Sequence, residues 1–224
     1  MISNRLSQTP PVVKNLIIIN VILYLALFVF ESVFQIDLNR YLGLFFPTSE
    51  HFKPFQIVTH MFMHGGITHI FFNMFALWMF GKALETVWGP KRFLLYYLVT
   101  GLGAAAIHTL TIYFQVLHYQ SNFSGYEFQQ ILSLIENIPT VGASGAVFGI
   151  LLAFGMLFPN TQLMLLFPPI PIRAKYFVMI YGGVELYLGI TQPGSSIAHF
   201  AHIGGMIFGY FLIRFWRKST NNFY

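Results

Sequence analysis

The sequence contains no cysteine in its 224 residues, which excludes disulfide bonds and thiolate chemistry. Charged residues make up only 8% of the chain, against about 25% in soluble globular domains. No basic run interleaved with aromatic residues indicates a nucleic-acid surface. Apolar residues are in excess instead, at 56% of the total, and they gather in runs that approach the ~20 residues needed to cross a bilayer. The composition predicts an all-α membrane protein with one compact helical domain.

Six apolar segments are expected to cross the bilayer as helices. They lie at 16–30, 66–88, 93–117, 141–158, 174–190 and 197–215. The expected fold is therefore a six-helix membrane bundle over residues 14–218, flanked by short polar tails at 1–13 and 219–224. The first segment has no clear small-residue cleavage site after it, which predicts that it is retained and not removed as a signal peptide.

Two connections are longer than a turn. Residues 31–58 hold most of the early charges and are expected to form a loop with short interfacial helices. Within 118–140, apolar residues recur at helical spacing among polar ones, which predicts an amphipathic helix lying in the membrane interface. These apolar residues are Phe128, Ile131, Leu132, Ile135 and Ile138.

Basic residues predict the orientation of the bundle. With six spans, all Lys and Arg except Arg40 and Lys53 fall on the side of the N-terminus. An excess of Lys and Arg marks the cytoplasmic side of a membrane protein. Both termini are therefore predicted to be cytoplasmic, and the second, fourth and sixth segments begin at the outer side.

A lone serine among small residues opens the fourth segment, in the stretch Val141–Ile150. Small residues let helices approach closely, and they leave backbone N–H groups open to a developing oxyanion. Two interpretations of Ser144 follow. It is a nucleophile, or it is a tolerated residue on the helix-packing face that Gly145 and Gly149 form.

Histidines stand at the outer starts of the second and sixth segments, where ionisable residues indicate function because they are costly to bury in a membrane. His202 shares a helix face with Gly205 and Gly209, and this face can approach the fourth segment closely. Serine attacks an acyl carbon only when a base removes its proton. His202 is therefore the candidate base for Ser144.

The second segment offers donors for the oxyanion of such a reaction. His69 and Asn73 are four residues apart and share one helix face. Together with the backbone N–H of Ser144 they are candidates for an oxyanion hole, and one such donor typically contributes ~10²–10³ in rate. We expect a polar cavity, open to the outer side, lined by His64, His69, Asn73 and His202.

An acid that would orient His202 is not obvious, because most carboxylates lie in loops. A Ser–His dyad without an acid is the favoured interpretation, and Glu185 within the fifth segment is a less favoured orienting group. Metal binding is a further alternative. His60 and His64 have metal-ligand spacing and His199 with His202 could add ligands, although no H-E-x-x-H motif or neighbouring carboxylate supports it.

Three motifs on these segments together resemble the rhomboid family of intramembrane serine proteases. The resemblance covers about residues 40–215, and although each motif is weak alone, the three in order on the second, fourth and sixth segments are specific. They are His60…His64…His69…Asn73 for the family's HxxxHxxxxHxxxN, Gly142-Ala143-Ser144-Gly145 for GxSG, and Ala201-His202-Ile203-Gly204-Gly205 with Gly209 for AHxxGxxxG.

The resemblance implies that Ser144 is the nucleophile and His202 the general base. It implies an oxyanion hole of His69, Asn73 and the backbone amides of Ser144 and Ala143. The remaining motif residues are expected to support the site: Gly142, Gly145, His64, Phe148, Gly205 and Gly209.

The resemblance also implies partners and a location. The substrate is a transmembrane protein segment in the lipid bilayer, cut near its outer end, often beside a small residue. The fifth segment and the loop 191–198 act as gate and cap. No cofactor, metal or nucleic acid is implied. The compact plan suggests a bacterial-type plasma membrane, with the active site open to the outer or periplasmic side.

Two positions depart from the family pattern. Phe55-Gln56 stands where the family often has Trp-Arg, which leaves the packing of the first loop open. Phe148 stands where many bacterial members have tyrosine, so that it either stacks on His202 or belongs to the core. Inactive relatives generally lack the serine or the histidine, and both are present here. A non-catalytic protein that binds membrane clients, and a metal-binding membrane protein or transporter, remain the alternatives to a protease.

Overall fold

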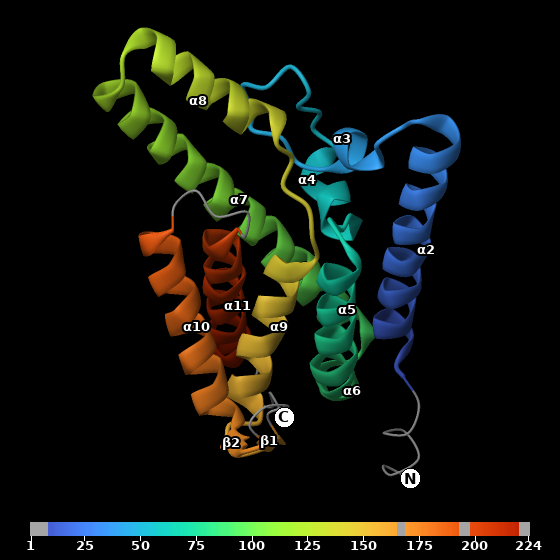
Figure 1. Cartoon of the computed structure of the whole chain (residues 1–224). Helices are drawn as coiled ribbons and strands as arrows, with labels where there is room; N and C mark the ends of the chain where they lie inside the picture. Colours follow the sequence, from blue (N-terminus) through green and yellow to red (C-terminus); the bar gives the residue numbers. More distant parts are fainter. Residues whose placement is uncertain (1–8, 165–168, 193–197, 220–224) are drawn as a thin grey trace.

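The computed structural model describes residues 9–164, 169–192 and 198–219. Six long helical segments run side by side in one bundle (Figure 1), and the predicted all-α fold is confirmed. In chain order they are α2 (Pro11–Phe34), the continuous segment α5 (Ile67–Ala76), η2 (Leu77–Gly81) and α6 (Lys82–Trp88), α7 (Pro90–Asn122), α9 (Ser144–Leu157), α10 (Ala174–Thr191) and α11 (His199–Ser219). The predicted tails at 1–13 and 219–224 lie partly outside the described residues, and so does the predicted loop 191–198, of which 193–197 is not described.

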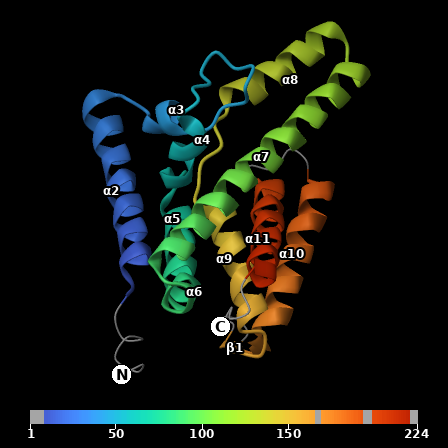
Figure 2. The same ribbon diagram turned by 180° about the vertical axis from the view of Figure 1, so that it is seen from behind.

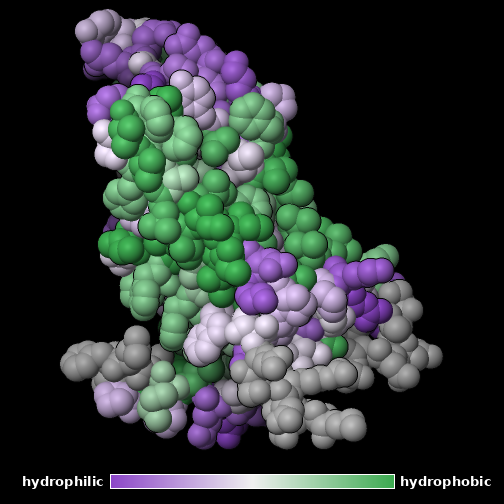
Figure 3. Space-filling view, turned by 90° about the vertical axis from the view of Figure 1, so that its right-hand side faces the viewer, coloured by the Kyte–Doolittle hydropathy of each residue, from purple (hydrophilic) through white to green (hydrophobic). Residues whose placement is uncertain are grey.

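Hydropathy agrees with a membrane location. Among the described residues, three helical segments are long and apolar enough to cross a membrane, namely α2, Ile67–Trp88 and α7, and α9 is apolar but shorter. On the face shown in Figure 3, hydrophobic residues fill a broad area between more hydrophilic regions toward the two ends. Many large apolar side chains along α2, α5, α7 and α10 are exposed, as expected for surfaces that face lipid.

The connections contain short elements that the sequence did not define. The first loop holds α3 (Leu38–Leu42), α4 (Gln56–Thr59) and the 3₁₀ turn η1 (His60–Phe62), in agreement with the expected short helices. Between α9 and α10 the chain forms an antiparallel pair of short strands, β1 (Gln162–Met164) and β2 (Pro171–Arg173). Pro171 is the first residue of β2. Proline tolerates an edge strand of this kind because its missing N–H faces outward.

The amphipathic helix predicted within 118–140 is confirmed as α8 (Gly125–Asn137). A capping box begins it, since the Ser124 hydroxyl and the Glu127 carboxylate each satisfy a backbone N–H at the helix start. Helix α7 extends past the predicted end at 117 and runs diagonally across the back of the bundle, and α8 folds back along it (Figure 2). The apolar face of α8 is half-buried by this packing.

Helices α7, α9 and α11 form the centre of the bundle, and glycines set their spacing. A Cβ added to Gly145 of α9 would lie 2.3 Å from the Cβ of Ala104 in α7. One added to Gly209 of α11 would lie 2.2 Å from the hydroxyl of Tyr96 in α7, which donates to the backbone oxygen of Gly149. Gly209 was expected to face the fourth segment, and its contact is with α7 instead. Small residues thus allow three helix backbones to meet closely.

A buried carboxylate joins α2 to the rest of the bundle. Glu85 in α6 is 2% exposed. Its two carboxylate oxygens accept hydrogen bonds from the backbone N–H groups of Val12, at 3.0 Å, and Val13, at 2.8 Å. These N–H groups belong to the first turn of α2, which has no partner for them within its own helix. The negative charge is also favourable at a helix N-terminus.

We expect Glu85→Ala to lower the free energy of unfolding by about 1–3 kcal/mol, because two buried donors lose their acceptor. Thermal or SDS-induced unfolding in detergent would measure this change. Glu31→Ala is the matched control, since Glu31 is exposed near the other end of α2. Equal stability of the two variants would contradict the role of Glu85 as the cap of α2.

Candidate active site

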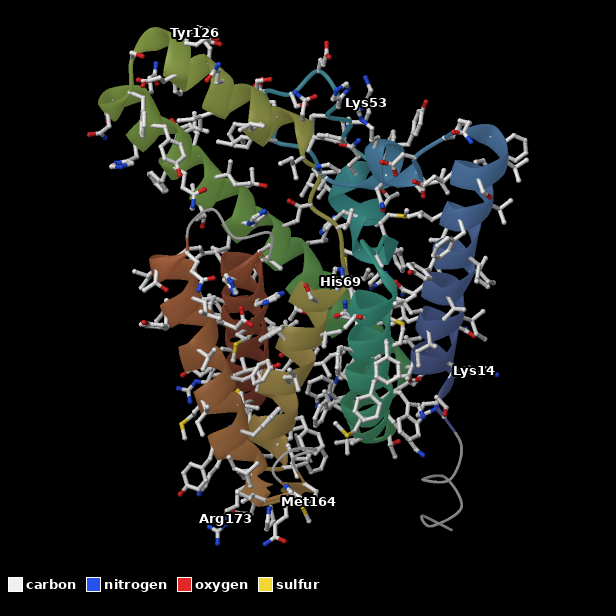
Figure 4. The ribbon with its side chains drawn as sticks, in the orientation of Figure 1. Lys14, Lys53, His69, Tyr126, Met164 and Arg173 are labelled. Carbon is white, nitrogen blue, oxygen red and sulfur yellow. The ribbon has the colours of Figure 1, made fainter. Side chains whose placement is uncertain are left out.

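The three helices that carry the motifs are α5, α9 and α11, and they come together part-way along the bundle. Helix α9 begins at Ser144 part-way down the bundle, after an extended segment that descends from α8 (Figure 1). Figure 4 shows His69 on α5 beside the start of α9, between the end that carries Lys53 and Tyr126 and the opposite end with Lys14 and Arg173. The serine therefore lies within the helical bundle and not on its rim.

Ser144 and His202 are in hydrogen-bonding contact. The Ser144 Oγ lies 2.9 Å from Nε2 of His202. His202 belongs to the first turn of α11, which places its imidazole beside the start of α9. Phe148, one turn after Ser144, stacks on the imidazole with ring centroids 4.1 Å apart and an interplanar angle of 5°. Both interpretations of Phe148 describe it, because it stacks on His202 and also belongs to the buried core. The distance is within the reach that a general base requires.

Backbone hydrogen bonds hold the segment that precedes Ser144. Thr140 exchanges both backbone hydrogen bonds with Leu44 of the first loop, at 2.8 and 2.9 Å. The N–H of Gly142 donates to the backbone oxygen of His60 at 2.9 Å. The first loop therefore sets the position of the serine, although the two are far apart in the sequence.

The first loop is itself braced by Gln56, at the departure from the family pattern. Gln56 is 1% exposed. Its amide nitrogen donates to the backbone oxygens of Tyr41, at 3.2 Å, and His51, at 3.0 Å, while its amide oxygen accepts from the N–H of Lys53 at 3.0 Å. One neutral side chain thus satisfies three backbone groups of the loop, and the loop packing left open by the sequence does not require an arginine.

Gly142 leaves open the space between His69 and the serine. Its φ of +134° lies in a region that favours glycine. A Cβ at this position would lie 2.8 Å from Nε2 of His69 and 3.6 Å from the Ser144 Oγ. The His69 imidazole thus reaches toward the nucleophile across a position that only glycine leaves free.

The start of α9 offers further hydrogen-bond donors, its backbone N–H groups, near the space between His69 and Ser144. Ala143 precedes the helix, and the first N–H groups of a helix have no partner within it. Asn73 is less directly placed. Its Nδ2 donates to the His69 backbone oxygen at 3.1 Å, which leaves one Nδ2–H for another acceptor. The described hydrogen bond of Asn73 is thus to the backbone of His69.

His64 and His60 lie in the turn before α5. The His64 ring packs edge-on against the His69 ring at 5.0 Å between centroids, and burial lowers its pKa to about 3, so that it is neutral at pH 7. The Nδ1 atom of His60 lies 2.9 Å from the backbone oxygen of Gln56. In the described part of the chain these two histidines do not belong to a group of three potential metal ligands.

A cavity of about 20 Å³ adjoins Ser144. Its polar lining comes from His60, His108, Thr140 and Ser144, with apolar residues of α7 and α9 around them. The lining predicted for a cavity here, with His64, His69, Asn73 and His202, differs from this one. A cavity of this size can hold one water molecule where polar partners surround it.

The structure also places an acid beside His202. The Glu185 Oε2 lies 2.8 Å from Nδ1 of His202 and 2.7 Å from Nδ1 of His199. All three side chains are buried. Glu185, the less favoured orienting group, thus lies in hydrogen-bonding contact with His202, while the favoured Ser–His dyad stays a prediction about the mechanism.

The Rhomboid domain matches residues 51–219. The chain belongs to the rhomboid family. It is therefore an integral membrane protein of a family that includes serine proteases.

The sequence of this rhomboid is similar to those of other rhomboid proteins, of which three are compared by identity and coverage. It is 32% identical over 156 residues, 70% of its length, to "Rhomboid protease GluP" of Bacillus subtilis (strain 168), of which it covers 25%. It is 30% identical over 156 residues, 66% of its length, to "Rhomboid protease AarA" of Providencia stuartii, of which it covers 51%. It is 29% identical over 154 residues, 69% of its length, to "Rhomboid protein 1, mitochondrial" of Saccharomyces cerevisiae, of which it covers 39%. The chain thus spans between a quarter and about half of each relative.

Close contact of two glycines sets the distance between the serine and the histidine of this rhomboid. A Cβ added to Gly205 of α11 would lie 1.9 Å from the backbone oxygen of Gly145 in α9. Gly205 follows His202 by three residues, and Gly145 follows Ser144 directly. Any separation of the two backbones would therefore separate the two side chains.

We expect Gly205→Ala to move α11 away from α9 and to slow the reaction of Ser144 with a serine-directed fluorophosphonate by about 10²-fold, since a displacement of ~1 Å at a reacting centre has that effect. Gly183→Ala is the control, because a Cβ there meets no atom within 4 Å. Labelling rates of the two purified variants would be compared in detergent. Equal rates would mean that the glycine contact does not set the site.

Proposed function

We propose that this rhomboid is an intramembrane serine endopeptidase that hydrolyses peptide bonds in transmembrane segments of other membrane proteins. The observation that carries the proposal is the 2.9 Å contact between the Ser144 Oγ and Nε2 of His202. A half-buried hydroxyl paired with an imidazole is an arrangement that suits nucleophilic catalysis. The similarity to proteins named as rhomboid proteases supports the same reaction class.

Acylation follows from this pair. The Ser144 Oγ attacks the carbonyl carbon of the scissile bond while its proton passes to Nε2 of His202. The tetrahedral intermediate collapses when His202 returns this proton to the leaving nitrogen and the C–N bond breaks. The carbonyl carbon is then held to Ser144 as an ester. Phe148 keeps the imidazole plane fixed during both transfers through its stack at 4.1 Å.

The oxyanion of this intermediate requires donors on the His69 side of the serine. The Nε2 of His69, the backbone N–H groups at the start of α9 and the second Nδ2–H of Asn73 are the donors that we assign to it. Gly142 provides the space for the oxyanion, because a side chain there would occupy it. Donors fixed in advance in a site of low dielectric stabilise the developing charge more than water would.

Hydrolysis of the ester requires one water. The cavity beside Ser144 has the volume for a single water molecule and polar groups from His60, His108 and Thr140. His202 takes a proton from this water, the hydroxide attacks the ester carbon, and the proton returns to Ser144 Oγ as the C–O bond breaks. The products are two chain fragments and the free enzyme.

We infer the location from the basic residues and the site. The cytoplasmic side is the one that carries both chain ends, since Lys and Arg gather there. The first loop, α8 and the active site then lie toward the outer side of a plasma membrane. A substrate helix would be cut near its outer end, with α10 as the gate, while the loop centred on 193–197 lies outside the described residues.

We expect wild-type protein in proteoliposomes to cleave a fluorogenic transmembrane peptide with a small residue near its outer end, and Ser144→Ala and His202→Ala to show no cleavage above background, because the nucleophile or its base is gone. Product formation would be followed by fluorescence and mass spectrometry in the presence of a chelator. Cleavage that persists in Ser144→Ala would reject Ser144 as nucleophile. No cleavage by folded wild-type protein over several peptides would favour a non-catalytic client-binding protein.

We expect Asn73→Ala to lower kcat by ~10²–10³, the typical effect of one oxyanion donor, with a small change in KM. Asn137→Ala is a matched control, since its Nδ2 makes the same kind of bond to the backbone oxygen four residues earlier, on α8, far from the serine. Steady-state kinetics on the fluorogenic peptide would separate the two constants. A change in KM alone would assign Asn73 to substrate binding.

A further inference from the structure

Glu185 is an ionisable residue in the middle of an apolar helix. It lies on α10 (Ala174–Thr191) and is 8% exposed. A carboxylate in such a position is costly unless it is paired and hydrogen-bonded. In the described part of the chain, its carboxylate lies in hydrogen-bonding contact with two imidazoles of α11, those of His199 and His202. A group of this cost, in contact with the proposed base, requires an explanation.

Close packing of α10 on α11 brings the carboxylate to the base. A Cβ at Gly182 would lie 3.0 Å from the Met206 side chain, and one at Gly189 would lie 3.1 Å from the Phe200 ring. Gly182, Glu185 and Gly189 are three and four residues apart, so they share one face of α10. The two glycines therefore let the α10 backbone approach α11 on both sides of Glu185.

Hydrogen bonding to the carboxylate determines which nitrogen of His202 carries a proton. An ionised carboxylate only accepts hydrogen bonds, so with Glu185 ionised we assign the proton of His202 to Nδ1, which lies 2.8 Å from Oε2. Nε2 then has a free lone pair, and it faces the Ser144 hydroxyl at 2.9 Å. The carboxylate thus selects the tautomer that can accept the serine proton.

We propose that Glu185 is the positioning residue of a Ser144–His202–Glu185 triad, in which its carboxylate holds the His202 tautomer and stabilises the imidazolium formed during acylation. His199 is the second donor to Oε2, at 2.7 Å, and fixes the carboxylate on its other side. Glu185 itself takes up no proton. The serine proton moves to Nε2 of His202 and then on to the leaving nitrogen, as in other triads of this kind.

A metal ion is the competing explanation of the same cluster. Glu185, His199 and His202 each offer one ligand atom, and these atoms lie within 4.8 Å of one another. A metal ion here would use the Nδ1 lone pair of His202, and Nδ1 could then not donate to Glu185. The distances of 2.7 and 2.8 Å between the carboxylate and the imidazoles are those of direct hydrogen bonds. The geometry therefore favours the triad.

The test uses the purified protein in proteoliposomes, with a chelator present. Its kinetic part rests on the proposed protease function. We expect Glu185→Gln to lower kcat by ~10²-fold with little change in KM, since the effect on general-base catalysis is typically 10²–10⁴. Glu185→Asp retains the charge and is expected to lose less. Glu31→Gln, on the exposed side of α2, is expected to match the wild type. Active-site titration with a fluorophosphonate corrects each kcat for the fraction of folded protein.

Three kinetic results would overturn the proposal. The first is a wild-type kcat in folded Glu185→Gln, which would make the charge irrelevant to the base. The second is a change confined to KM, which would place Glu185 in substrate binding. The third is loss of wild-type cleavage in the chelator with recovery on adding zinc, which would make the cluster a metal site.

A second measurement does not depend on cleavage. In ¹⁵N-histidine-labelled protein, the Nδ1–H proton of His202 bonded to a carboxylate is expected far downfield in the proton NMR spectrum, absent in His202→Ala and shifted upfield in Glu185→Gln. An identical signal in wild type and Glu185→Gln would overturn the triad. If wild-type protein cleaves no peptide but this signal depends on Glu185, the protease proposal fails and the Glu185–His202 interaction stands.

Discussion

The backbone contact between α9 and α11 is the constraint on which the site depends. Gly145 and Gly205 meet so closely that a single added carbon at Gly205 would lie 1.9 Å from a backbone oxygen. This contact brings the first turns of both helices together, and those turns carry Ser144 and His202. In a membrane the helices gain little from apolar burial against each other, so close packing of small residues determines where they associate. The reactive pair is therefore set by helix packing.

Two buried carboxylates in the interior of the bundle are each paired with hydrogen-bond partners of the protein. Lipid offers no partner to a buried carboxylate, and both Glu185 and Glu85 find their hydrogen-bond partners within the protein. Glu185 accepts from two imidazoles, and Glu85 accepts from two backbone N–H groups of α2. The first arrangement lies at the candidate active site, whereas the second joins two helices. The two buried carboxylates thus have different roles: Glu185 lies at the candidate active site, and Glu85 joins α6 to α2.

Some of this could be predicted from residue order. The helix faces followed from spacing, since Gly205 lies three residues after His202 and Phe148 four after Ser144, and both proved to face the expected partner. Glu185 was harder to assign, because a lone carboxylate in an apolar helix does not indicate which neighbouring helix it meets. The strand pair after α9 and the brace formed by Gln56 were not predicted, because they depend on backbone groups that only the fold brings together.

The sequence by itself determined the class of the protein, the six helical segments, the rhomboid family and the residues that carry its motifs, since these depend on composition and on local spacing. Tertiary structure alone decided which groups touch. It placed Gly209 against α7, gave the cavity beside Ser144 a different lining, and set Glu185 against Nδ1 of His202. The physical reason is that periodicity fixes the face on which a side chain lies, while the partner of that face depends on how separate helices pack.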